Sequence, residues 1–140
     1  MSRRNAPARG SEVAGGPGAT EAFVRRGVEL YNAGCYWEAH EALEAVWRRA
    51  RSPQRELWQG LIQAAAAMLH RERGNRHGVL VTGGAALEKL RVGAPPDFPV
   101  ETDRFVRALA ICLEGGGPVP PMEYTSAPAS RQPGRRIMDA

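Results

Sequence analysis

His40, Glu41 and Glu44 lie within one short segment, residues 36–47, which reads YWEAHEALEAVW. If this segment is a helix with about 100° of rotation per residue, His40 and Glu44 share its apolar face. The apolar members of that face are Tyr36, Trp37, Leu43 and Trp47. A buried polar group needs a hydrogen-bond partner or a ligand, because leaving it unpaired costs about 1 to 3 kcal/mol. The spacing therefore predicts a polar cluster that faces a neighbouring helix and not bulk water.

These residues could form a metal-dependent catalytic site. In the zinc protease motif H-E-x-x-H, the two histidines bind the metal and the glutamate acts as a general base. The segment here reads H-E-x-x-E, so His40 and Glu44 could bind a divalent metal while Glu41 acts as the base. His70 or His77, from later helices, is the candidate for a third ligand. This hypothesis predicts a metal-dependent, hydrolase-like enzyme.

A structural interpretation uses the same cluster differently. Gln59, Gln63 and His70 line one side of the following helix. Glu44 could accept a hydrogen bond from His40, from a tryptophan indole, or from an amide of Gln59 or Gln63. Such a network would fix how the two helices pack, with no metal and no substrate. We favour this interpretation, which predicts a non-enzymatic domain that associates with a second copy of itself or with another protein. A metal-free ligand pocket around the same residues is a third alternative.

The spacing of apolar residues and the start and stop signals predict an all-α fold of about five helices. Thr20 and Thr102 are candidate N-caps. Ser52 and Pro53 separate the second helix from the third, and Gly74 suits the left-handed position after the third. No segment shows the alternation of a β-strand. The predicted helices span residues 20–33, 36–51, 53–73, 76–92 and 102–114.

The predicted helix 53–73 should lie at the centre of the bundle. It carries no charged residue from Leu57 to Leu69, which is unusual for a helix at the surface. In the next helix, Gly83 and Gly84 each cost about 1 kcal/mol of helix stability relative to alanine. Their presence in spite of this cost indicates that a neighbouring helix packs closely against them. Near the start of that helix, His77 could hold an anion together with backbone amides, although a solvated histidine is the commoner case.

Both ends of the chain differ in composition from its middle. Residues 1–19 contain four glycines and two prolines with almost no large apolar side chain, and residues 115–140 are rich in proline and arginine. Such segments bury too little apolar surface to offset the entropy lost on ordering. The sequence therefore predicts one helical domain over residues 20–114 between two disordered tails.

Composition narrows the class of protein further. A chain of 140 residues with 43% hydrophobic residues can bury one core without disulfides. The net charge is +4, but the two tails account for three of these charges, so nucleic-acid binding is not favoured. No stretch approaches the 18 or so apolar residues that span a membrane. Cys35 and Cys112 lack the spacing of a metal site, so a cytoplasmic protein with two reduced, partly buried thiols is expected.

Several motifs occur in an order that resembles a known family. The segments that carry the resemblance are residues 32–44, Trp47, residues 59–63, His70, residues 74–75 and Gly78. Together they resemble the family of small, all-helical bacterial domains named domain of unknown function 309, over roughly residues 23–92. The resemblance implies a small helical bundle and brings no established activity, so it supports the predicted fold and leaves the function open.

Overall fold

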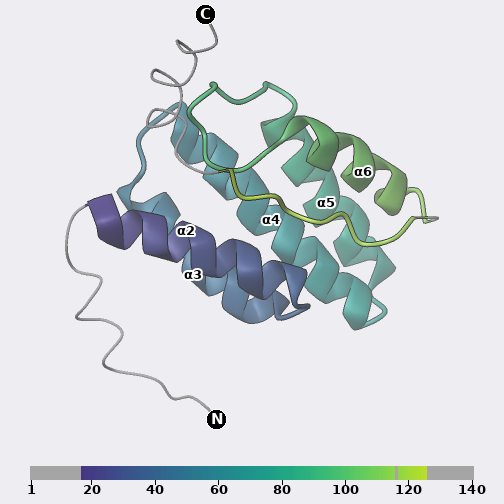
Figure 1. Cartoon of the computed structure of the whole chain (residues 1–140). Helices are drawn as coiled ribbons and strands as arrows, with labels where there is room; N and C mark the ends of the chain where they lie inside the picture. The colour runs from purple at the N-terminus through teal and green to yellow at the C-terminus, as the bar shows by residue number, and fades with distance from the viewer. Residues whose placement is uncertain (1–16, 116, 126–140) are drawn as a thin grey trace, which may run out of the picture.

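Five α-helices make up most of the described chain. The computed structural model describes residues 17–115 and 117–125 (Figure 1). Within those residues the only β pairing is an isolated bridge between Val100 and Tyr124. The predicted all-α fold with five helices is thus confirmed. The helices are α2 (Pro17–Asn32), α3 (Tyr36–Arg49), α4 (Gln54–Glu72), α5 (Arg76–Leu90) and α6 (Asp103–Leu113).

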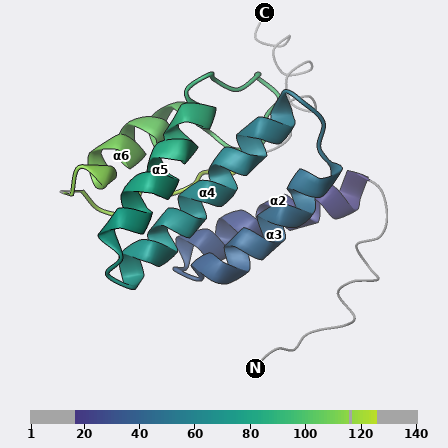
Figure 2. The same ribbon diagram turned by 180° about the vertical axis from the view of Figure 1, so that it is seen from behind.

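The helices lie in two layers. In one layer α4 lies between α3 and α5, as seen from the side shown in Figure 2. In the other layer α2 packs on α3 and α6 packs on α5, and a short C-terminal segment crosses α4 between them (Figure 1). Each helix therefore buries one face against the neighbouring layer and leaves another face toward solvent.

The predicted helix boundaries agree with the structure to within three residues. The largest difference is at the first helix, which begins at Pro17, so that Thr20 lies inside α2 and does not cap it. After α4, Gly74 adopts the expected left-handed backbone with φ of 72°. The side chain of Asn75 then accepts a hydrogen bond from the backbone nitrogen of Gly78 (3.0 Å) and caps α5.

The buried position of the central helix α4 explains why it carries no charged residue from Leu57 to Leu69. Its buried side chains are at most 8% exposed, and α4 contacts both α3 and α5. They include Leu57, Leu61, Ala64, Ala65 and Met68. The close approach predicted at two glycines of α5 is confirmed at one of them. A Cβ on Gly83 would lie 2.5 Å from a methyl group of Leu113, whereas a Cβ on Gly84 would meet no atom within 4 Å.

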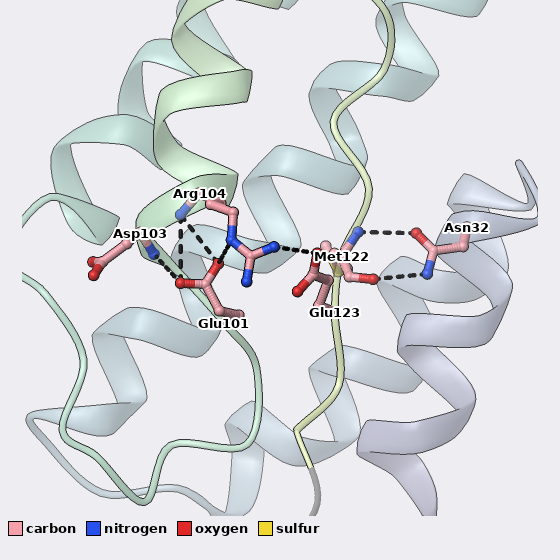
Figure 3. Close-up of polar contacts among 6 residues, drawn as sticks. All are labelled: Asn32, Glu101, Asp103, Arg104, Met122 and Glu123. Carbon is pink, nitrogen blue, oxygen red and sulfur yellow. Dashed lines mark hydrogen bonds and ion pairs between the residues drawn. The ribbon is translucent and has the colours of Figure 1, made fainter.

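Residues 117–125, which we call the C-terminal strap, lie against the bundle. The buried hydroxyl of Tyr31 donates to the carbonyl of Pro120 (2.7 Å). The amide of Asn32 donates to the carbonyl of Met122 (2.8 Å) and accepts from its backbone nitrogen (2.9 Å; Figure 3). Because the sequence places this segment in a tail, the predicted boundary at residue 114 is too early. The disorder predicted for residues 1–16 and 126–140 falls outside the described residues.

Residues at the start of α6 hold the strap from the side opposite Asn32 (Figure 3). Arg104 Nη1 lies 3.2 Å from Glu123 Oε2, and its Nε lies 3.9 Å from Glu101 Oε1 (Figure 3). Glu101 also accepts hydrogen bonds from the backbone nitrogens of Asp103 and Arg104, both at 3.1 Å. The carboxylate of Glu101 therefore caps α6, and the side chain of Thr102, expected to do so, makes no capping hydrogen bond.

The buried hydroxyl of Tyr31 predicts a loss of stability at alkaline pH. Burial raises the pKa of Tyr31 far above its ordinary value of 10.0, and the neighbouring Tyr36 and Cys112 raise it further. Because the folded state holds this proton more tightly than the unfolded state does, the stabilisation is complete below pH 10 and decreases as the pH rises above it.

Replacement of Tyr31 by phenylalanine should remove this dependence. We expect Tyr31→Phe to lower the free energy of unfolding at neutral pH by about 1 kcal/mol, because the carbonyl of Pro120 loses its donor. Between about pH 9 and pH 11, the variant should lose about 1.4 kcal/mol less stability than the wild type. Urea unfolding across this range measures both quantities. Parallel pH profiles for the two proteins would contradict the prediction.

Candidate functional site

Trp37 and His40 form a stacked pair on α3. Their ring centroids lie 5.4 Å apart and their planes differ by only 6°. His40 is half-buried, and its Nδ1 is buried without a hydrogen-bond partner among the described residues. Trp37 is 52% exposed, whereas Leu43 of the same helix is fully buried. The prediction that Trp37 shares an inward face with Leu43 is therefore wrong, and the stacked pair lies at the edge of the buried face.

The two glutamates of the motif reach the surface. Glu44 Oε1 lies 3.5 Å from Arg48 Nη2, and the two side chains are 35% and 67% exposed. Glu41 is exposed. Within the described part of the chain, no hydrogen bond or ion pair joins Glu44 to His40. Of the alternative hydrogen bonds predicted for Glu44, the one with His40 is therefore not formed among the described residues.

The polar residues of α4 separate into two places. Gln59, Gln63 and His70 are all half-buried, and Oε1 of Gln63 is buried without a partner among the described residues. His70 Nδ1 lies 3.1 Å from Asn75 Nδ2, at the turn into α5. A Cβ on Gly78 would come within 2.6 Å of the His70 ring. His70 is therefore packed against the start of α5 and belongs to a different part of the surface from Gln63.

The helix geometry shows which candidates can meet. α3 and α4 contact each other and are joined by residues 50–53. Residues equally distant from the connection in an antiparallel helix pair lie at the same level, which matches His40 with Gln63. His70 lies seven residues beyond Gln63, which is about 10 Å farther along the helix. Across residues 17–115 and 117–125, no three His, Cys, Asp or Glu side chains are placed to hold one metal ion.

Acidic and basic residues are segregated along α3 and the connection that follows it. Residues 36–44 contain three glutamates and no arginine or lysine, whereas residues 45–55 contain four arginines and no acidic residue. One of these arginines, Arg55, stacks its guanidinium 4.0 Å from the centroid of the Trp47 ring. The segregation of charge is visible in the sequence, but its meaning depends on which face of α3 is exposed.

The comparison with protein families agrees with the motifs. Residues 24–82 match the family model described as "Domain of unknown function (DUF309)". This match confirms the resemblance predicted from the motifs, over most of the predicted range. No curated protein and no solved structure matches the chain. None of the described helices is long and apolar enough to cross a membrane.

Proposed function

We propose that this helical domain, whose family match carries no activity, is a non-enzymatic module that pairs with a second copy of itself through α3. The observation that carries the proposal is the exposed Trp37 on a helix whose acidic and basic residues are segregated. The contact surface, which we call the α3 outer face, consists of Trp37, Glu41, Glu44 and Arg48. Their spacing of four, three and four residues aligns them in one stripe along the helix.

The charge pattern of this stripe complements itself. When two copies pair about a two-fold axis, the same surface is used twice, so each residue contacts a different residue of the other copy. If two α3 helices cross in antiparallel orientation, the acidic first half of each meets the basic second half of the other. Glu41 of one copy then faces Arg48 of its partner, and the charges favour this pairing over a parallel one.

Trp37 supplies the apolar contact that this pairing needs. Tryptophan is among the residues that most often dominate the energy of protein interfaces. Stacking on His40 restricts the rotamers of the indole, so less side-chain entropy is lost when the ring is buried by a partner. In this proposal His40 positions Trp37 and Glu41 is an interface residue, not a catalytic base.

We also propose that His40 and Gln63 stabilise the packing of α3 on α4. Nδ1 of His40 and Oε1 of Gln63 are complementary as donor and acceptor, and both are buried without a partner among the described residues. Their matched levels on the two helices would allow a hydrogen bond after a small side-chain adjustment. This is the part of the predicted polar network that the geometry supports, and it excludes Glu44 and His70.

Charge reversal tests the proposed pairing. We expect a dimer in sedimentation velocity at about 100 µM protein and low salt, which weakens as salt screens the charges. Arg48→Glu and Glu41→Arg should each raise the dimer dissociation constant about ten-fold, because each variant brings like charges together. The double variant with both changes should recover most of the affinity. Trp37→Ala should weaken pairing by at least about ten-fold.

Control measurements distinguish a loss of pairing from an effect of net charge and from a loss of folding stability. Arg107→Glu changes an exposed residue of α6 and should leave the dissociation constant unchanged. Arg48→Glu also breaks the exposed Arg48–Glu44 pair, which contributes at most about 1 kcal/mol to folding. A monomer at every concentration, or a double variant as weak as the single ones, would rule out the proposed interface. Tight divalent-metal binding that His40→Gln abolishes would favour the enzymatic hypothesis instead.

A further inference from the structure

A small cationic pocket lies at the end of the bundle where α4 turns into α5. It forms where the turn between α4 and α5 meets the last turn of α6, and its volume is about 240 Å³. Pockets for drug-sized ligands have volumes of about 300 to 1,000 Å³, so this pocket suits a smaller molecule or one chemical group of a larger one. The lining residues are Arg71, Gly74, Asn75, Arg76, Val79, Cys112 and Gly115.

One guanidinium of the pocket is held in place. Arg71 Nη1 donates to the sulfur of Cys112 (3.1 Å), and Nη2 donates to the carbonyl of Gly117 in the C-terminal strap (3.2 Å). Neither acceptor is a carboxylate, so the positive charge of Arg71 is not neutralised by these contacts. The two bonds fix the orientation of the group, and a guanidinium has further N–H donors available for a ligand.

The second guanidinium lacks a partner within the described residues. Arg76 lies in the first turn of α5, and no hydrogen bond or ion pair joins it to another described residue. Next to it, Gly115 has a φ of 95°, and a Cβ there would lie 3.6 Å from Arg76 Nη2. The glycine therefore leaves the guanidinium accessible from the pocket.

The charges around the pocket add up to a positive site. No acidic side chain lines it. The N-terminus of α5 meets the C-termini of α4 and α6 at this region, and each helix end is equivalent to about half a charge, positive for α5 and negative for α4 and α6. The helix dipoles therefore add no net positive charge, and the positive potential of the pocket comes from Arg71 and Arg76. Two guanidinium groups at one small pocket suit an oxyanion, which each group can bind with two parallel hydrogen bonds.

We infer that the pocket formed by Arg71 and Arg76 binds a phosphate group. The group could be inorganic phosphate or the phosphate of a small phosphomonoester, and the pocket chemistry is the same in both cases. This site is independent of the proposed pairing through α3, because none of its lining residues belongs to α3.

Isothermal titration of the full chain with inorganic phosphate at low ionic strength tests this inference. We expect saturable binding with a dissociation constant in the millimolar range, about 1 mM. Arg76→Gln should weaken it about ten-fold or more, and Arg76→Lys should give an intermediate value because the charge is kept while the planar fork is lost. Titration with phosphoserine identifies the source: tighter binding than phosphate indicates a phosphomonoester, and equal or weaker binding indicates the free ion.

A matched control tests whether the effect is specific to the pocket. Arg73 is exposed on the same turn but does not line the pocket, so Arg73→Gln should change the dissociation constant by less than about two-fold. The inference is overturned if the wild type shows no saturable binding up to about 20 mM phosphate. It is also overturned if Arg76→Gln binds like the wild type, or if Arg73→Gln weakens binding as much as Arg76→Gln.

Discussion

A chain that ends at Gly115 should be less stable than the full chain by about 5 to 10 kcal/mol. Without the C-terminal strap, the protein loses the buried side chains of Met122 and Pro120, and each large apolar group contributes about 1.5 to 3 kcal/mol. The buried hydroxyl of Tyr31 loses its partner, at about 1 to 3 kcal/mol, and the exposed amide of Asn32 loses its hydrogen bonds, at about 0.5 to 1.5 kcal/mol. Because small domains are stable by only about 5 to 15 kcal/mol, this loss brings the truncated domain close to unfolding.

Urea denaturation followed by circular dichroism measures this effect. The matched control is a chain that ends at Thr125, which keeps the strap and should differ from the full chain by less than about 0.5 kcal/mol. If the shorter chain does not fold, Met122→Ala in the full chain provides a measurable intermediate, with an expected loss of about 2 to 4 kcal/mol. Equal stability of the chains that end at Gly115 and Thr125 would contradict the structural role of the strap.

The strap also shows the limit of prediction from sequence. The helices could be predicted because apolar residues recur with the helical period and because glycine and proline stop each run, as Gly74 does after α4. The strap has no period and its composition resembles that of a disordered tail. It is ordered by Tyr31 and Asn32, which lie about ninety residues earlier in the chain. Contacts across such a separation leave no local signal in a single sequence.

The error at the candidate site has a geometric cause. The buried residues of α3 include Tyr36, Ala39, Leu43 and Val46. Trp37, His40 and Glu44 each follow one of these residues directly, so each lies about 100° around the helix from that residue, at or beyond the edge of the buried face. Small residues such as Ala39 give a weak apolar signal and Trp37 gives a strong one, which moved the predicted face toward the polar residues. The presence of a helix was predictable, but its rotation was not.

The rotation of α3 can be tested through the contact between Leu43 and Gly27 of α2. Leu43 is fully buried, and a Cβ on Gly27 would lie only 2.7 Å from one of its methyl groups. Leu43→Ala should lower the free energy of unfolding by about 3 kcal/mol, because it leaves a cavity between the two helices. Trp37→Ala on the same helix should cost less than about 1 kcal/mol, because its side chain is half exposed and fills no core space.

The effect of Gly27→Ala on the free energy of unfolding should change sign between the wild type and the Leu43→Ala variant. In the wild type the new methyl group collides with Leu43 and should destabilise the fold by about 1 kcal/mol, despite the better helix propensity of alanine. In the Leu43→Ala background the same methyl group fills part of the cavity, and the gain in propensity remains, so the variant should be about 1 kcal/mol more stable than Leu43→Ala alone. A double-mutant cycle by urea denaturation gives the coupling energy directly. An effect of Gly27→Ala that is equal in both backgrounds would mean that Leu43 does not face α2, and the assignment of Trp37, Glu41 and Arg48 to the outer face would then fail as well.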